Sequence, residues 1–389
     1  MKFRKAITAA LTVLILCMGQ VDAKPGNGGG KPGGGGEDPP ATTSCASNPS
    51  TFPAFAYTRL NVKKRSVSSI DFYLSNAAGD CSILIHTADV DENEVDLSYR
   101  QIGNNGVIAW SQGRDETQSR KSAAKDNFVI RVLRFQVSSK EVSSVQPVET
   151  VANSGDPYIY FDSIHLSPDG KSIVFIHSDS VVYGTYIQTI REIDISNCSS
   201  NCVQSVIYAQ SNVEQLSSIS YGAYSDRVYY SGGFKSSSGD PRGSQGFISF
   251  IKNVGSSWSV PRELTYEGNG FYGSGFSGVV TFWELDAALV DFGNGVLTEA
   301  VSYRFNNIAM GQDDVHVIDV GTCSASGSGD CLSTGESSLE ISLANASLPS
   351  LGRDSLLFSS GSSDSIFEYV FNSEALSIVA LGNEADSAH

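Results

Sequence analysis

Basic side chains are scarce in this sequence. Its 389 residues include 26 Lys and Arg against 42 Asp and Glu, which gives a formal net charge of -16. An excess of negative charge repels phosphate groups and anionic lipid headgroups. Nucleic acid and acidic membrane surfaces are therefore not expected partners.

Long apolar runs are also scarce. The run from Ala6 to Met18 is too short to span a bilayer, and no later stretch is long and apolar enough. It follows the basic residues 1–5 and precedes Val21-Asp22-Ala23, so residues 1–23 are predicted to be a signal peptide cleaved after Ala23. We expect a secreted or periplasmic protein without a membrane span.

A lipid anchor is the less favoured alternative for the same N-terminal segment. A lipobox needs a small residue before its cysteine, whereas Cys17 follows Leu16 and lies inside the apolar run. The other six cysteines lie beyond the predicted cleavage site and would meet an oxidising compartment. Their even number indicates three disulfides.

Helical periodicity is nearly absent. Short runs rich in Val, Ile, Tyr and Phe recur instead, separated by Ser, Gly, Asn and Asp, which is typical of an all-β chain. Residues 24–44 are rich in Gly and Pro and are predicted to form a flexible tether. We expect one domain over residues 45–384 and a disordered tail over residues 385–389.

A repeat of about 45 to 60 residues runs through this domain, in the range of propeller blades. Its clearest copy, Ser163–Ile176, has a strand, the turn Pro168-Asp169-Gly170 and a second strand. Pro suits the first corner of such a turn, and Gly accepts a positive φ. Weaker copies of the turn and its following strand lie at 102–111, 224–231 and 351–359.

A further strand, which comes after a variable loop, recurs six times. The six candidates lie at 69–74, 128–133, 186–195, 246–250, 314–319 and 365–370. They predict a β-propeller of six blades, each with four antiparallel strands, in which the innermost strand precedes the Asp/Gly turn. The first blade lacks an innermost strand because the chain enters at 54–57, so we expect strands from both ends of the domain to close the ring.

Two segments carry a resemblance to a known family. Ser167-Pro168-Asp169-Gly170-Lys171 with its Ile-Val-Phe strand, and the segment Tyr73–Gly79, resemble the repeat of TolB-type propellers, relatives of the WD-repeat fold. The resemblance covers about residues 51–382. It implies a six-bladed propeller and an envelope partner, whereas function has to be argued from the site, because propellers host enzymes and binding modules alike.

Assembled catalytic motifs are missing. The glycines of Gly268–Gly273 fit G-x-G-x-x-G, but no βαβ unit surrounds them, so an inter-blade loop is the better interpretation. Gly275–Gly278 falls short of a nucleophile elbow. The five histidines form no zinc-binding pattern, and His165 and His177, on neighbouring strands, are expected to be packed residues rather than metal or proton-transfer groups.

One acidic segment, 89–96, is the single candidate for a metal site. Carboxylate and amide oxygens are the ligands that calcium prefers. The EF-hand pattern fails, because its glycine position holds Glu94 and its twelfth position holds Arg100. A solvated loop is therefore the default interpretation and no cofactor is expected; calcium is the alternative, with the candidate ligands Asp89, Asp91, Asn93 and Asp96.

These observations favour an exported, monomeric, non-catalytic binding module that uses the faces of a propeller. Its expected partner is an envelope or extracellular protein or a glycan, met by long loops such as Gly113–Asp126 and Lys235–Gly246. The alternative is a secreted carbohydrate-active hydrolase or lyase, which would place two or three carboxylates with His or Arg in a deep axial pocket. A self-associating structural component of the cell surface is a third possibility.

The positions of the cysteines within the repeat also reduce the number of plausible disulfide pairings. Two pairs, Cys198–Cys202 and Cys323–Cys331, fall after predicted third strands and would each close one hairpin. Cys81 begins a fourth strand without a cysteine in its own turn, which leaves Cys45 after the tether as its partner.

We therefore predict the disulfides Cys45–Cys81, Cys198–Cys202 and Cys323–Cys331. Loop-closure entropy gives about 3.8 kcal/mol for the first and about 2 to 2.6 kcal/mol for each short loop, so the bond to Cys45 should stabilise the fold most. Non-reducing peptide mapping checks the pairing. Cys45 joined to any cysteine but Cys81, or a Cys198 that can be alkylated in the native protein, would contradict it.

Overall fold

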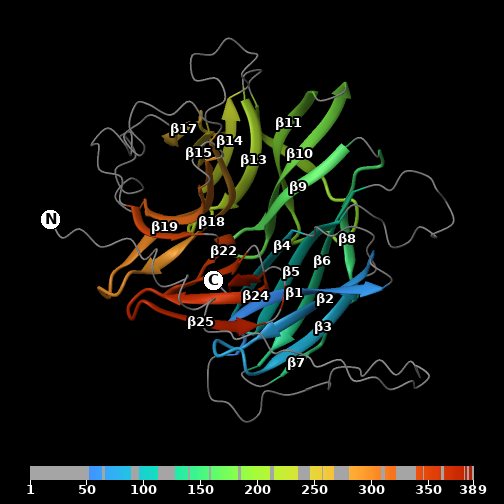
Figure 1. Ribbon diagram of the computed structural model, residues 1–389. Coiled ribbons are helices and arrows are strands. Elements are labelled where there is room, and N and C mark those ends of the chain that lie inside the picture. Colours follow the sequence, from blue (N-terminus) through green and yellow to red (C-terminus); the bar gives the residue numbers. More distant parts are fainter. Residues whose placement is uncertain are drawn as a thin grey trace, which may run out of the picture.

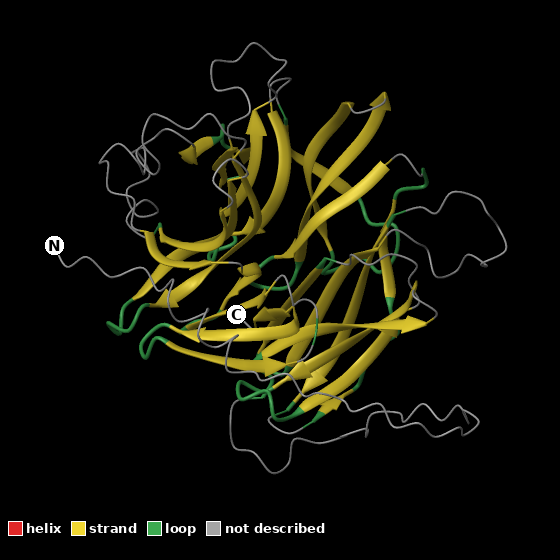
Figure 2. Ribbon diagram, in the orientation of Figure 1, coloured by secondary structure: helices red, strands yellow, loops and turns green. Residues whose placement is uncertain are grey.

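The protein is a ring of six antiparallel sheets in the computed structural model (Figure 1). The structure describes residues 52–387 except 64–65, 89–95, 113–127, 139–140, 157–158, 183–184, 211–213, 235–245, 256, 267–279, 308–311, 321–338, 345, 361–362, 381 and 383–384. These residues form strands, turns and loops without a helix (Figure 2). Accordingly, the described part of the chain has no helix that could cross a membrane.

In each of the first three blades, the strands follow one another from the axis outward. Blade 1 consists of β26 (Ala385–Ser387), β1 (Phe55–Lys63), β2 (Ser66–Ser75) and β3 (Ser82–Ala88). Blade 2 consists of β4 (Leu97–Ile102), β5 (Asn105–Gln112), β6 (Val129–Val137) and the short β7 (Val142–Ser143) and β8 (Glu149–Asn153). Blade 3 consists of β9 (Ile159–Leu166), β10 (Ser172–Val182), β11 (Thr185–Asp194) and β12 (Gln204–Ala209).

The other three blades follow the same order. Blade 4 consists of β13 (Glu214–Tyr221), β14 (Arg227–Phe234), β15 (Gly246–Val254) and the short β16 (Ser257–Trp258) and β17 (Arg262–Tyr266). Blade 5 consists of β18 (Val280–Asp291), β19 (Leu297–Asn307), β20 (Gln312–Asp319) and β21 (Leu339–Ala344). Blade 6 consists of β22 (Ala346–Leu351), β23 (Ser355–Ser360), β24 (Ser363–Val370) and β25 (Ala375–Ala380).

The predicted fold is confirmed at the level of individual strands. All six predicted third strands fall on the third strand of a blade, namely β2, β6, β11, β15, β20 and β24. β9 precedes the Pro168-Asp169-Gly170 turn and is the innermost strand of its blade. The match follows from burial: third strands carry long runs of β-branched and aromatic residues because a propeller covers both of their faces.

The ring closes with a strand from the end of the domain, as expected. Phe55, Ala56 and Tyr57 of β1 pair with Ser387, Asp386 and Ala385 of β26. The expectation of a disordered tail at 385–389 is therefore wrong for residues 385–387, all of which are buried. A three-residue strand shows no periodicity, and its polar composition resembles that of a tail.

The turn of blade 3 shows why its sequence is so regular. Gly170 has a φ of +64°, and its N–H donates to the Ser167 carbonyl at 2.8 Å. The Ser167 hydroxyl accepts from the backbone N–H of Lys171 at 3.1 Å and of Ser172 at 2.9 Å. A Cβ atom on Gly170 would stand 2.6 Å from Cδ1 of Ile102 in blade 2. The turn is thus a contact between blades.

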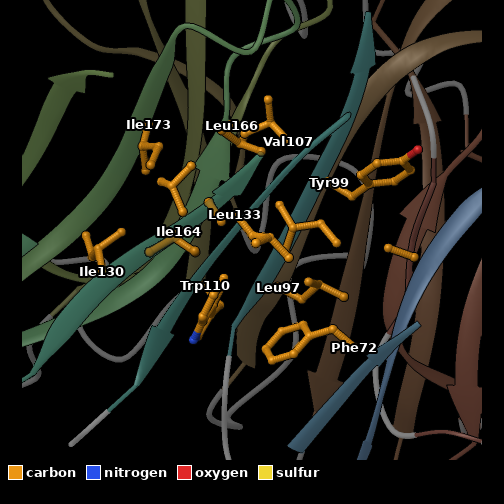
Figure 3. Packing of buried hydrophobic residues seen from close by; sticks show 14 of the residues in the cluster. Phe72, Leu97, Tyr99, Val107, Trp110, Ile130, Leu133, Ile164, Leu166 and Ile173 are labelled. Carbon is orange, nitrogen blue, oxygen red and sulfur yellow. The ribbon is translucent and has the colours of Figure 1, made fainter. Parts of the chain in front are cut away.

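Apolar side chains fill the spaces between neighbouring blades. The largest cluster joins blades 1, 2 and 3 and includes Phe72, Trp110 and Ile164 (Figure 3). The rings of Phe72 and Trp110 lie 4.8 Å apart between centroids. Separate clusters join the later blades, so that each blade packs mainly against its neighbours in the ring.

One of the predicted cysteine pairs lies within the described residues. Cys198 and Cys202 form a disulfide in the turn between β11 and β12, the third and fourth strands of blade 3. Cys81 directly precedes β3 and is also disulfide-bonded. Cys45 and the pair Cys323–Cys331 lie outside the described residues, so these pairings remain predictions.

Replacing Gly170 by Ala should destabilise the protein more than the same change at Gly103. Both glycines have a positive φ, which costs a side chain about 1–2 kcal/mol, but a Cβ at Gly103 meets no atom within 4 Å. Urea unfolding of Gly170→Ala and Gly103→Ala separates backbone strain from the contact with Ile102. If both variants lose the same stability, the Ile102 side chain moves away from the added methyl group at no cost in free energy.

Candidate functional site

Polar side chains follow one another around the axis of the ring. Each innermost strand has one hydrogen-bonded neighbour in its own sheet, so its other edge faces the axis. A buried polar residue occupies the same position on each of these strands, usually between apolar residues. We name this set the inner ring: Ser98, His165, Ser220, Asp286, Ser350 and Asp386.

The inner ring connects each blade to the next one. In five of the six blade junctions its side chain accepts a hydrogen bond from a backbone N–H of the following blade. The donors and acceptors are Leu166 to Ser98 at 3.0 Å, Tyr221 to His165 at 3.2 Å, Leu351 to Asp286 at 2.7 Å, Ser387 to Ser350 at 2.9 Å and Tyr99 to Asp386 at 2.5 Å.

A second set of side chains repeats this connection two residues earlier in four blades. We name it the outer ring: Asp96, Ser163, Ser218 and Glu284. Its members accept from Ser163 at 2.7 Å, Ile219 at 2.9 Å, Leu285 at 2.9 Å and Leu348 at 2.5 Å. The two rings satisfy backbone donors that no strand of the same sheet could reach.

Bulges in three innermost strands orient side chains of the two rings toward the next blade. Ser163, Glu284 and Leu348 have φ values of 47°, 54° and 50°, and the strand pairing shifts at each of them. A bulge adds one residue to a strand and redirects the side chains around it. Such a conformation is uncommon for residues other than glycine, and its recurrence in three blades marks it as part of the repeat.

Charged residues of the inner ring meet at the axis. His165 Nε2 lies 2.9 Å from Asp286 Oδ1, and Arg100 Nη2 lies 3.3 Å from the His165 ring nitrogens. Arg100 Nη1 lies 3.6 Å from Asp386 Oδ2. All four side chains are buried, so the cluster is held by contacts among blades 1, 2, 3 and 5.

The hydrogen bonds of His165 define its protonation state. Nδ1 accepts from the Tyr221 backbone N–H, which leaves Nε2 to donate to Asp286. Burial, followed by the Arg100 charge, lowers the pKa of His165 below its ordinary value, although Asp286 opposes the shift. The imidazole is therefore neutral near pH 7 and acts as a bridge between Arg100 and Asp286.

A cavity of about 700 Å³ lies above this cluster, at the end where the innermost strands begin. His165, Asp286, Ser350 and Asp386 form its floor. Its walls include the outer ring, Asp162 of β9 and four aromatic side chains: Phe128, Tyr160, Phe161 and Trp283. No Lys or Arg is among the described residues that line it.

The predicted site residues fall in different places. Asp96 lies in the cavity wall as a member of the outer ring, whereas Asp89, Asp91 and Asn93 lie outside the described residues. Within the described part of the chain, no group of three or more His, Cys, Asp or Glu side chains could hold a metal ion. The glycine segments at 268–273 and 275–278 also lie outside it.

His177 is a packed residue in the structure. Its ring lies 5.9 Å from that of Phe161, and burial, then the Arg191 charge, lowers its pKa to about 4. His316 lies 5.1 Å from Phe305, and burial likewise lowers its pKa to about 4. Neither histidine is among the residues that line the cavity.

Sequence reasoning missed Arg100, Asp286 and Asp386. Their partners lie far along the chain: the bond between Tyr99 and Asp386 spans 287 residues. A signal was nevertheless present, because an apolar–polar–apolar triplet stands on several innermost strands. It occurs as Leu97-Ser98-Tyr99, Ile164-His165-Leu166, Ile219-Ser220-Tyr221 and Leu285-Asp286-Ala287.

Comparisons by sequence identify no relative. No protein-family model matches the chain, and no curated protein matches it. Solved structures match by shape. A chain of a nidogen–laminin complex is 9% identical with a TM-score of 0.46, over 86% of this chain and 97% of that one.

Two further solved structures are similar in shape. A TolB protein from Agrobacterium tumefaciens is 9% identical with a TM-score of 0.43, over 84% of this chain and 88% of its own. Prolyl oligopeptidase B from Galerina marginata is 9% identical with a TM-score of 0.43, over 87% of this chain but only 41% of the peptidase. At such identities no activity or partner transfers to this chain.

Replacing Asp386 by Ala should destabilise the protein by about 3–5 kcal/mol, because the change leaves the buried Arg100 guanidinium without its carboxylate. It also removes the acceptor for Tyr99 and for the Ser350 hydroxyl. Asp354→Ala, in an exposed turn, is the control and should change stability by less than about 0.5 kcal/mol. Urea unfolding measures the stability of both variants. Similar losses of stability in the two would show that the contacts of Asp386 between blades do not stabilise the ring.

Proposed function

We propose that this protein is an exported, non-catalytic binding module whose ligand occupies the axial cavity. The observation that carries the proposal is the cavity itself, since about 700 Å³ lies within the range of ligand pockets. The expected partner remains an envelope or extracellular protein or a glycan. Export is supported by the signal-peptide pattern of residues 1–23 and by the disulfide at Cys198–Cys202.

A structural role for the floor carboxylates supports the absence of catalysis. Asp286 Oδ1 accepts from Ala287 N at 2.8 Å and from His165, and Oδ2 accepts from Leu351 N. Asp386 Oδ1 accepts from the Ser350 hydroxyl at 2.8 Å, and Oδ2 accepts from Tyr99 N. A general acid or base must exchange a proton with the substrate, whereas these oxygens are occupied by bonds that hold blades together.

The segments around the cavity are consistent with binding. The loop Gly113–Asp126, expected to meet a partner, lies outside the described residues. Gln112 and Phe128, the described residues on either side of segment 113–127, both line the cavity. A ligand in the cavity would therefore lie near Gln112 and Phe128.

A carbohydrate-active hydrolase or lyase remains the second candidate function. Five carboxylates line the cavity together with His165, and Arg100 lies beside the floor, which is the set expected of such an enzyme. Asp162 is the most exposed of the carboxylates. Release of sugars from polysaccharide by the purified protein, abolished in Asp162→Asn, would favour this enzyme over the binding module.

Replacing Ser217 by Trp should obstruct ligand binding without loss of fold. Ser217 lines the cavity with an exposed side chain, so the larger side chain would project into the cavity and occupy part of it. We expect ligands found by thermal-shift screening of peptides and oligosaccharides to raise the Tm of the wild type but not of Ser217→Trp, and to remain chemically intact. A ligand that stabilises both proteins equally would place the binding site elsewhere.

A further inference from the structure

The described lining of the cavity is acidic. Five acidic side chains line it, Asp96, Asp162, Glu284, Asp286 and Asp386, while no described lining residue is Lys or Arg. Arg100 lies 3.6 Å from Asp386, and Arg304 lies 3.0 Å from Glu284, each from outside the lining. His165 is neutral, so it adds no positive charge to the floor.

The shape of the site strengthens this field. A concave wall of one charge sign concentrates field lines and raises the local concentration of opposite charges. The described walls offer no cationic side chain to an anionic ligand. A neutral ligand would gain nothing from the charge of the acidic lining, whereas a cation would.

Two wall residues, Glu284 and Trp283, contact a guanidinium group from outside the cavity. The Arg304 guanidinium forms two bonds to Asp313, at 2.7 and 2.8 Å, and donates to Glu284 Oε1 at 3.0 Å; its carbon lies 5.9 Å from the centre of the Trp283 ring. A carboxylate beside an aromatic face is a favourable environment for such a cation. Asp162 and Tyr160 of β9 provide the same two kinds of group elsewhere in the wall.

We propose that the axial cavity binds a cationic segment of a partner polypeptide, with an arginine or lysine side chain beside Asp162. The proposal rests on the proposed function and adds the chemical class of the ligand. Asp162 is exposed and accepts a hydrogen bond from the Ser178 hydroxyl at 3.0 Å, which orients its carboxylate. Tyr160, whose ring lies 4.8 Å from that of Phe128, supplies an aromatic surface in the same wall.

Isothermal titration with two peptides tests the proposal. Triarginine carries guanidinium groups, and tricitrulline has nearly the same shape without their charge. We expect triarginine to bind at least about tenfold more tightly than tricitrulline, with an affinity that falls as salt is raised. Asp162→Asn, which keeps an acceptor for Ser178, should weaken triarginine binding about tenfold.

Two control variants identify the site of binding. Asp354→Asn changes the net charge by the same amount in an exposed turn away from the cavity and should leave the affinity unchanged. Ser217→Arg, which adds a cationic side chain to the cavity lining, should abolish triarginine binding while the far-UV circular dichroism stays that of the wild type. Equal weakening by Asp162→Asn and Asp354→Asn, or full binding by Ser217→Arg, would overturn the proposal in favour of general attraction to an acidic surface.

Failure of this inference is distinguishable from failure of the proposed function. Triarginine that binds no better than tricitrulline overturns the cationic ligand. If an oligosaccharide or a neutral peptide then binds the wild type and not Ser217→Trp, the binding module stands with a different ligand. If sugars are released instead, the proposed function itself is wrong.

Discussion

The structure depends on how the free edges of its innermost strands are satisfied. Each of these strands pairs on one side only, and an unpaired backbone N–H that is buried costs as much as a lost hydrogen bond. Hydroxyl, imidazole and carboxylate groups from the preceding blade accept these hydrogens. The identity of the axial residues is therefore set first by the need to join blades.

This constraint also determines the chemistry of the cavity. Carboxylates are the strongest acceptors for backbone donors, and Asp96, Glu284, Asp286 and Asp386 all serve in that role. The same oxygens give the floor and wall their negative charge. An acidic pocket with histidine and arginine can thus arise from architecture, without selection for acid–base catalysis.

The sequence was informative where local chemistry decides the structure. Gly170 and the β-branched runs around it fixed a turn and two strands, and the third strands repeated at a regular interval. It was less informative where distant segments meet, as with Arg100 and Asp386, whose pairing has no local signature. The mistaken tail at 385–387 has the same origin, because three residues acquire strand structure only from β1. The acidic segment 89–96 was predicted as a possible calcium site. Asp96, the residue of this segment that the structure describes, accepts a hydrogen bond from the Ser163 backbone N–H of the next blade.

The pairing of β26 with β1 makes blade 1 the blade with the most distant strands along the chain. Blades 2 to 6 consist of consecutive strands and can form as the chain becomes available, but blade 1 needs residues about 330 positions apart. Until Ala385–Ser387 dock, β1 presents an open edge to other chains, and such edges promote aggregation. Ala385–Ser387 thus cover an edge of β1 that could otherwise pair with a strand of another molecule.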